Sequence, residues 1–491
     1  MPTDKPYVPD AAPTTQGAAP TVTEMEDVFF DEDCGIYASP NGMQMLRPGE
    51  LPSPLSEVVA NAPMNRRAGS FFAAATALAT LATRIRCRYY HNTFRLHALL
   101  LQTIVEGPQS CGKSFVADIE NLIMGPTLRK RDAEQRKLEM QYAEKKRRRA
   151  SNKELPEEPK TTVRCLPATV SKTRLLSRSV ALEMSYNEQL TFWQFGEELS
   201  QVSDSNKRGF SDLRTILRTA YDLGSLWGQD YFTSDSCSAI VDLMLNSLYC
   251  ATPSAVDYLY DNKAILGGDI TRTIIVSLED SPENDTQMFL PYTPEQQENI
   301  NRTLQRVMDD CYLPNGQIQP TKLIDMSWID RECKLFISRK ADLYGKVGKE
   351  SVNVFRKRSS VSAFRIATLC YYLFSISMGF DPTLSEGDEK ARRYCRRIYR
   401  FCAEYIFRSM LHRWGERFDQ LDAKGRIQEP QSPKRETFFD ALPDEFDRNT
   451  LQLTMKEYQI VSPARQFIWL WSKRLHIIEQ IGPHQWRKIR K

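Results

Sequence analysis

The chain has 491 residues, enough for roughly two to four domains, and its 41% hydrophobic and 26% charged residues are typical of a soluble protein with a buried core. A formal net charge of only +4 argues against a chain that is basic throughout, so any surface for nucleic acid must be local. The 11 cysteines are scattered without a Cys-x-x-Cys pair, which argues against a disulfide framework or a zinc site and favours a reducing, cytoplasmic location.

The N-terminal part of the chain combines a segment without periodicity and a helical pattern. Residues 1–45 are rich in Pro, Thr, Ala and acidic residues, and we expect them to be disordered and to carry no signal peptide. Residues 46–97 are expected to form a helical lead-in. The most apolar stretches, 70–83 and 364–380, are shorter or more polar than a membrane-spanning helix requires, so we expect buried helices and no membrane partner.

The most informative motif is Gly-Pro-Gln-Ser-Cys-Gly-Lys-Ser, which fits the pattern Gly-x4-Gly-Lys-Ser/Thr at every fixed position. It follows an apolar run typical of a buried parallel strand and precedes a helical pattern over 115–124. Such a loop surrounds phosphate with backbone N–H groups and a helix N-terminus. All of its residues are therefore expected to bind ATP: Gly107, Pro108, Gln109, Ser110, Cys111, Gly112, Lys113 and Ser114. We expect Lys113 to reach the β- and γ-phosphates and Ser114 to hold Mg²⁺.

Strand and helix patterns alternate over residues 98–284, which predicts a P-loop ATPase core with a mostly parallel sheet. We expect strands at 163–166, 190–195, 240–249 and 271–278, and helices at 171–182 and 211–220. Residues 126–160 are expected to form a charged helical insertion, with Asp132/Arg136 and Glu144/Arg148 as i,i+4 pairs on a solvated helix. Residues 285–430 have helical patterns and are expected to form a helical C-terminal domain.

Hydrolysis also needs an acidic site near the phosphates. Glu197 and Glu198 follow the strand expected at 190–195, and carboxylates at the C-terminal end of a parallel strand face the crevice that ligands use. We expect Glu197 to hold the metal and Glu198 to activate water, although two glutamates can also simply open a helix. Thr252 is preferred over Asn246 as a further polar group near the γ-phosphate, but it could equally start a helix.

One single arginine, one group of arginines and one terminal segment are further candidates. Arg272 precedes an apolar strand, and it could reach the phosphate of a neighbouring subunit or form a structural ion pair. The group of arginines crowds one helix face and suggests either DNA tracking or a solvated surface: Arg392, Arg393, Arg396, Arg397 and Arg400. Residues 431–491 are predicted to form a winged helix-turn-helix, with three helices and a hairpin. We expect Asp447 to cap its second helix and Ser462 its third. Its candidates for DNA contact, for which protein contact is the alternative, are Arg465, Lys473, Arg487 and Lys488.

With these motifs in place, residues 50–415 resemble the P-loop ATPases of unknown function that are encoded beside primases in bacterial mobile elements and suggest kinship with replicative helicases. The match rests on the Gly107–Ser114 loop, on Phe195 to Leu199 and on more diffuse segments such as Gly268 to Arg272. Members of that family usually have Asp-Glu where this chain has Glu197-Glu198. The resemblance implies an oligomeric ATPase of DNA replication or mobilisation, with a primase as a possible partner.

Together these patterns predict a RecA- or AAA-like α/β core, a helical region and a terminal winged helix. The expected function is ATP hydrolysis coupled to single-stranded or duplex DNA, as a helicase or helicase loader of a mobile genetic element. The alternatives are a nucleotide-gated DNA-binding scaffold with little turnover and a small-molecule kinase. The additional helical and winged modules argue against the kinase, because a kinase of that class needs only a compact core and lid.

Overall fold

The computed structural model describes residues 35–148, 157–200, 213–230, 238–280, 288–428, 438–439, 441–458, 464–469, 471–472 and 477–489. The chain divides into two compact units, residues 1–416 and 417–491, which we call the core unit and the terminal unit. The expected ATPase core and most of the expected helical domain therefore share one compact unit. Most of the N-terminal segment expected to be disordered lies outside the described residues.

The core unit is an α/β structure whose centre is a five-stranded, all-parallel sheet in the order β4-β5-β8-β3-β9. Its strands are β3 (Gln102–Glu106), β4 (Cys165–Leu166), β5 (Phe192–Gly196), β8 (Leu245–Ala251) and β9 (Ile274–Ser277). Every residue of β3 and β8 is buried, as expected for strands covered on both faces. The remaining strands are β1 (Ile85–Tyr89), β2 (Asn92–Ala98), β6 (Leu226–Gln229), β7 (Ala239–Asp242) and β10 (Lys322–Leu323).

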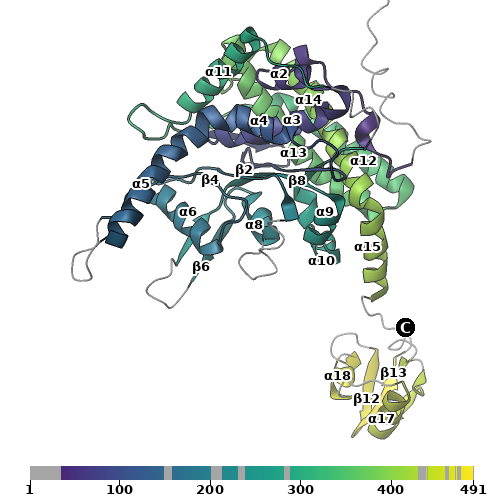
Figure 1. The fold of residues 1–491 in the computed structure, drawn as a ribbon. Helices are drawn as coiled ribbons and strands as arrows, with labels where there is room; N and C mark the ends of the chain where they lie inside the picture. Colours follow the sequence, from purple (N-terminus) through teal and green to yellow (C-terminus); the bar gives the residue numbers. More distant parts are fainter. Residues whose placement is uncertain are drawn as a thin grey trace, which may run out of the picture. The chain divides into compact units, whose positions relative to one another are not determined.

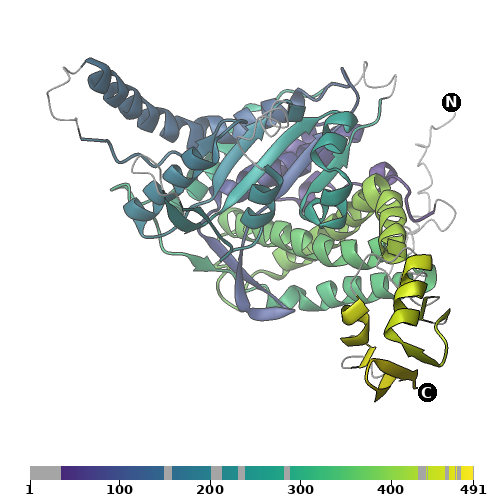
Figure 2. The ribbon, with the colours of Figure 1, turned by 90° about the horizontal axis from the view of Figure 1, so that it is seen from below.

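Helices cover both faces of the sheet (Figure 1). On one side lie α2 (Leu55–Asn61), α3 (Arg67–Leu81), α4 (Phe115–Met124), α11 (Pro294–Asp309), α13 (Glu350–Met378) and α14 (Glu389–Met410). On the other lie α6 (Lys172–Tyr186), α8 (Leu213–Ala220), α9 (Pro253–Leu259) and α10 (Asn262–Leu266). The other helices that begin in this unit are α5 (Lys130–Arg148), α12 (Asp330–Val347) and α15 (Glu416–Gln428). Figure 2 shows α5 projecting away from the body of the core unit.

The helix α3 is the centre of one helical layer, because nearly all of its side chains are buried. An alanine-rich helix that is apolar around its whole circumference can approach a sheet closely on one side and other helices on the others. The hydroxyls of Thr76 and Thr103, 2.7 Å apart, join α3 to β3. The helix therefore fixes the strand that precedes the Gly107–Ser114 loop.

The long helix α13 is buried against the rest of the core unit. By length and composition it could cross a membrane, but 78% of its most apolar window is buried within the protein, as expected for the core helix of a soluble protein. At its centre the fully buried Arg365 donates a hydrogen bond of 2.8 Å to the Leu100 carbonyl and forms an ion pair with Asp222. A guanidinium is thus neutralised inside the apolar helix, which ties α13 to the segment entering β3.

Three expectations for the core unit were wrong. The lead-in is not helical to residue 97, because β1 and β2 form an antiparallel hairpin in which β1 is mostly buried and the first five residues of β2 are exposed. The strand expected at 240–249 is two strands, β7 and β8, which belong to different sheets. Asp132 is not on a solvated helix face, since it is buried and accepts hydrogen bonds from the backbone N–H groups of Arg164 and Cys165.

The terminal unit contains a three-stranded antiparallel sheet with the order β11-β13-β12 and at least two helices. Its elements after α15 are β11 (Glu445–Asp447), α17 (Arg448–Glu457), α18 (Ala464–Trp469), β12 (Ile478–Gly482) and β13 (Gln485–Lys488). The predicted cap is confirmed, because the Asp447 carboxylate accepts a 2.7 Å hydrogen bond from the N–H of Thr450. The predicted hairpin is also present, but β11 was missed. The first expected helix of this module is described only in part, and Ser462 lies outside the described residues.

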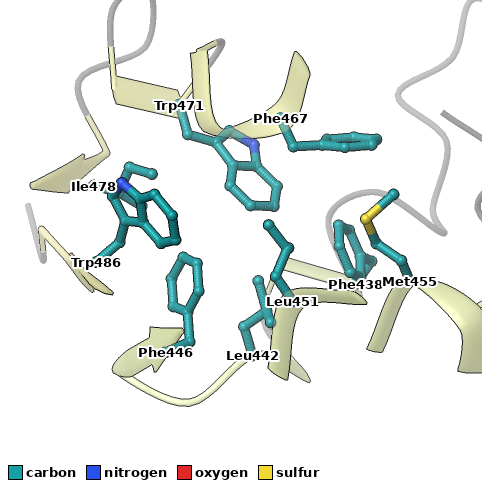
Figure 3. Close-up of a cluster of buried hydrophobic side chains, with 9 residues drawn as sticks. All are labelled: Phe438, Leu442, Phe446, Leu451, Met455, Phe467, Trp471, Ile478 and Trp486. Atoms are coloured by element: carbon teal, nitrogen blue, oxygen red, sulfur yellow. The ribbon is translucent and has the colours of Figure 1, made fainter. Parts of the chain in front are cut away.

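Figure 3 shows the hydrophobic core of the terminal unit. Its buried side chains are Phe438, Leu442, Phe446, Leu451, Met455, Phe467, Trp471, Ile478 and Trp486. Phe438, Phe467 and Trp471 form mutual ring contacts with centroids 5.4–5.7 Å apart. This cluster lies entirely within the terminal unit, which therefore has a core of its own.

His97 provides a pH-dependent test of this packing. The pKa of His97 is lowered to about 4, first by burial and then by the positive charge of Arg365, which donates to its Nδ1 atom at 3.5 Å. The unfolded chain binds a proton near pH 6.5 that the folded chain does not. Stability is therefore full above pH 6.5 and is lost as the pH falls towards 4.

We predict that the titration of His97 lowers the free energy of unfolding by about 3 kcal/mol when the pH falls from 7 to 4. The measurement is urea unfolding of the wild-type chain and of His97→Asn across this range. The variant lacks the titrating imidazole. Between pH 7 and pH 4 its free energy of unfolding should therefore fall by about 3 kcal/mol less than that of the wild type. Parallel pH profiles of the two proteins would contradict the burial of a neutral imidazole.

Candidate functional site

The Gly107–Ser114 loop joins the end of β3, a strand inside the sheet, to the first turn of α4. Ser110 and Gly112 have φ of +62° and +74°, so the loop makes a sharp turn through the left-handed region. At Gly107 a Cβ atom would lie 2.6 Å from Cys111 Sγ and 3.1 Å from Leu278 Cβ, so only glycine fits there. The predicted strand, loop and helix are therefore all present around this motif.

Two basic side chains hold the loop. Lys113 Nζ folds back over it and donates a hydrogen bond of 2.9 Å to the Gly107 carbonyl and another to the Pro108 carbonyl. Arg66, which is buried just before α3, donates a 2.8 Å hydrogen bond to the Cys111 carbonyl from the inner side. The Ser114 side chain does not cap α4. The loop therefore presents a cationic group and an exposed hydroxyl next to each other.

Glu197 comes to the same edge of the sheet as the loop. Gly196 pairs with Tyr249 and Glu106 pairs with Ala251, so β8 alone separates the ends of β5 and β3. Burial raises the pKa of the Cys250 thiol to about 12, while the positive charge of Lys113 lowers it and the negative charge of Glu197 raises it. Both charges therefore act on one buried sulfur at the end of β8. The loop lysine expected at the phosphates and the glutamate expected at the metal therefore lie at the same edge of the sheet.

The helix α4 and the strand β5 are locked together below the loop. The indole Nε1 of Trp193 donates a 2.8 Å hydrogen bond to the buried Glu120 carboxylate, which also pairs with Arg129 at 2.6 Å. Burial raises the pKa of Glu120, and the nearby charge of Glu197 raises it further. Glu197 is therefore near both α4 and β8, and Glu197 and Glu198 are both exposed. Glu198 accepts a long 3.5 Å contact from the Ser200 hydroxyl.

A second ion pair lies at this edge of the sheet, and the sequence did not predict it. Glu106, the last residue of β3, is buried and pairs with Arg413 at 3.0 Å. Arg413 also donates to the carbonyl of Pro253, the first residue of α9, and pairs with Asp257 within the same helix. It comes from the π-helical turn Leu411–Gly415 that follows α14, more than 300 positions along the chain, so no local pattern could indicate it.

The two polar residues considered for β8 have different positions. Asn246 lies near the amino end of the strand, where its amide bonds the Leu99 carbonyl and the N–H of Leu101, so its role is structural. Thr252 directly follows β8 at the edge that carries the loop. Its hydroxyl accepts from the N–H of Ala255 and caps α9, as the alternative reading of this residue predicted.

Within one chain, Arg272 lies far from the Gly107–Ser114 loop. It precedes β9, and because parallel strands share one direction, it lies at the opposite, amino-terminal edge of the sheet. There it approaches the Tyr221 ring, as do Arg358 and Arg365, with guanidinium carbons 5.9, 5.7 and 4.1 Å from the ring centroid. Burial lowers the pKa of Arg272, and the charge of Arg358 lowers it further. Arg358 and Arg365 both pair with Asp222, and the negative charge of Asp222 raises the pKa of Arg272.

The arginine-rich face of α14 is largely neutralised. Arg396 pairs with Glu389, Arg397 with Glu50, and Arg400 makes a two-pronged contact with Glu332 at 2.7 and 2.9 Å. Arg392 and Arg396 also lie over the Trp328 ring at 5.7 and 5.6 Å. These contacts favour the reading of a structural, solvated face over that of a DNA track.

The residues of the terminal unit that are candidates for DNA contact differ in exposure and in the contacts that they already make. Arg465 is exposed on α18 beside Trp469, whose side chain is 60% exposed. Arg487 lies between Glu445 at 2.8 Å and Glu479 at 3.4 Å on the neighbouring strands. Lys488 bonds the Leu442 carbonyl and lies over the Phe439 ring at 4.9 Å. Lys473 lies outside the described residues.

In comparisons with known proteins, no protein-family model matches the chain, and no curated protein matches it. Among the described residues, no group of three or more His, Cys, Asp or Glu side chains is arranged to hold a metal ion. A hydroxyl and one carboxylate, as at Ser114 and Glu197, form a smaller donor set that suits Mg²⁺ when the substrate supplies phosphate oxygens.

The Glu106–Arg413 pair yields a prediction about stability. Arg413→Met removes the partner of a buried carboxylate and should lower the free energy of unfolding by about 3 kcal/mol. Adding Glu106→Gln removes the uncompensated charge, so the double variant should recover most of that loss. Urea unfolding of the wild type, both single variants and the double variant measures the coupling. If the two single losses simply add, the side chains do not interact.

Proposed function

We propose that this protein is an ATP-hydrolysing, DNA-associated P-loop protein with a RecA- or AAA-like core. In this proposal it acts as a helicase or helicase loader in the replication or mobilisation of a mobile genetic element. The observation that carries the proposal is the placement of the Gly107–Ser114 loop between β3 and α4, with Lys113 over the loop and Glu197 one strand away. A five-stranded parallel sheet in which one strand separates the loop from the acidic strand end is compatible with a RecA-like core.

The proposed roles of the loop and of the two glutamates follow from the chemistry of their groups. The backbone N–H groups and the start of α4 favour the triphosphate anion, and Lys113 exchanges its carbonyl partners for phosphate oxygens. Ser114 and Glu197 would hold Mg²⁺, which neutralises charge on the β- and γ-phosphates when bound. Glu198 is exposed at the same strand end and is the residue proposed to orient and deprotonate the attacking water.

Two roles are assigned beyond the loop. Thr252 is proposed as a polar contact near the γ-phosphate, supported by its position at the end of β8, although its hydroxyl already caps α9. Arg272 is proposed to contact the phosphate of a neighbouring subunit in a homo-oligomer, because its place at the opposite edge of the sheet keeps it from its own loop. Its structural alternative is its own surroundings, where it donates to the Gly268 carbonyl at 3.3 Å and approaches the Tyr221 ring near the charge of Asp222.

The terminal unit is proposed to be a winged helix that contacts duplex DNA. This rests on its two described helices and three-stranded sheet, its own hydrophobic core, and the exposed Arg465 and Trp469 on α18. Arg487 and Lys488 support it less, because glutamates and backbone groups already engage them. A primase partner and a cytoplasmic location remain proposals that follow from the family resemblance and from the reduced cysteines.

A nucleotide-gated DNA-binding scaffold with little turnover is the second candidate. The observation that favours it is Glu197, whose side chain is one methylene longer than the aspartate usual at this position in the resembled family. A displaced metal ligand would slow hydrolysis without preventing nucleotide binding. The rate of hydrolysis with and without DNA therefore separates the two candidates.

We predict that Lys113→Ala abolishes tight ATP binding and leaves the fold intact. The variant removes a phosphate counter-charge from a half-buried loop position, so its thermal unfolding should match the wild type within experimental error. The measurement is equilibrium binding of a fluorescent ATP analogue, followed by ATPase assays without DNA, with single strands and with duplex. Unchanged affinity in the folded variant would refute the assignment of the loop.

The two glutamates should separate binding from hydrolysis. Glu198→Gln keeps the shape of the side chain and removes the basic carboxylate, so it should bind Mg·ATP normally and lose hydrolysis by about 100-fold or more. Glu197→Gln should instead raise the concentration of Mg²⁺ needed for half-maximal activity. The steady-state rate as a function of Mg²⁺ distinguishes them. Wild-type kinetics in both variants would place the acidic site elsewhere.

A further inference from the structure

The β1–β2 hairpin carries a concentration of basic and aromatic side chains that the proposed mechanism does not use. From Arg67 to Val105 the sequence contains no Asp or Glu, and its hairpin segment 84–98 contains four Arg, two His, two Tyr and one Phe. Side chains 91–96 are all exposed. A cationic surface with an exposed aromatic ring suits a polyanion whose bases can stack.

The two faces of the hairpin differ. The inner face is anchored, because Tyr89 donates to or accepts from the Ser360 hydroxyl at 2.6 Å and packs edge-on against Phe364 of α13. Cys87 and His97, which pair across the strands, are buried on the same face. The hairpin is therefore held rigidly by one face and leaves the other for contact.

The outer face carries Arg88, Leu96 and Phe94. Arg88 pairs directly with Leu96, and both side chains are exposed. Phe94 lies two residues before Leu96 on β2, where the pairing shifts in register, and it is exposed as well. The Phe94 ring is 98% exposed, and its backbone is fixed by a hydrogen bond from its N–H to the Asn92 side chain. Most solvent-exposed apolar side chains are partly covered by neighbours, whereas this ring is presented in full.

The arginines of the hairpin also differ in whether other residues of the chain already bind their guanidinium groups. Arg84 pairs with Glu188, and Arg86 donates to the backbone carbonyls of Thr83 and Ile85. Arg95 donates to the Leu223 carbonyl from the other face. Arg88 forms no ion pair or hydrogen bond with any residue that the structure describes, and it is exposed. Its charge therefore remains for a partner outside the chain.

We infer that the outer face of the β1–β2 hairpin binds single-stranded nucleic acid, with Phe94 stacking on a base and Arg88 contacting a phosphate. Single strands fit better than duplex, because a stacking ring needs an unpaired base face and duplex bases are already stacked. This inference deepens the proposed function and rests on its association with DNA. It assigns the contact to the core unit, apart from the duplex contact proposed for the terminal unit.

The test is binding of a fluorescein-labelled oligodeoxythymidylate to the full chain, measured by fluorescence anisotropy at several salt concentrations. Phe94→Ala should weaken binding about tenfold. Arg88→Ala should lower the slope of log affinity against log salt by about 0.7, the value for one phosphate contact to a single strand. Both side chains are exposed, so thermal unfolding should stay as in the wild type.

Matched controls come from exposed residues elsewhere in the core unit. Leu226→Ala removes a 71% exposed apolar side chain from the other hairpin, and Arg302→Ala removes an exposed arginine from α11. Neither should change the affinity or the salt slope. A benzoylphenylalanine photocrosslinker at position 94 should form a covalent adduct with the oligonucleotide, whereas the same group at position 226 should not.

The outcomes separate this inference from the function on which it rests. If the wild type binds the oligonucleotide and both hairpin variants bind equally well, the inference is wrong and the proposed function stands. Crosslinking of position 94 to a second copy of the chain would likewise overturn it and make the hairpin an interface between subunits. If the wild type binds no DNA, single-stranded or duplex, the proposed DNA association fails with it.

Discussion

The parallel pairing of β3 with β8 on one side and β9 on the other is the constraint from which the architecture follows. Parallel strands all end at one edge, so residues from distant parts of the chain meet there without any local signal. Gly107, Glu197 and Thr252 each follow a different strand, yet they gather at this edge because their strands share a direction. The same rule places Arg272 at the other edge, away from the loop.

Buried arginines connect the helical layers to this sheet. Arg365 reaches from α13 to the Leu100 carbonyl before β3, and Arg164 bonds the carbonyls of Thr80 and Thr191, joining α3 to the entry of β5. Arg66 does the same for the loop. Guanidinium groups suit this task because five donors in one plane can satisfy several carbonyls at once. Replacing Arg164 or Arg365 by an aliphatic side chain would leave several buried acceptors without a donor.

The sequence was informative where a local pattern fixes local structure. The strand, loop and helix around Gly107–Ser114, the strand before Glu197, the Asp447 cap and the terminal hairpin could all be predicted, because periodicity and capping act over a few residues. Contacts across hundreds of positions could not: nothing near Arg413 indicates Glu106, and nothing near Asp132 indicates that two backbone N–H groups would bury its carboxylate. The β1–β2 hairpin was missed because its strands lack the alternation that indicates a strand: β1 is buried at four of its five residues, and the first five residues of β2 are exposed.

The uninterrupted burial of residues 97–107 has a consequence for how the hairpin and the loop are joined. This segment begins in β2, turns where the N–H of Leu100 donates to the Ala98 carbonyl, and continues through β3 to the first glycine of the loop. Because β2 and β3 belong to different sheets, the segment crosses from one sheet to the other inside the protein. None of its residues is exposed, so it offers no surface position for a proteolytic cut or a tolerated insertion. The hairpin and the loop therefore cannot be separated by inserted residues without disturbing the packed core.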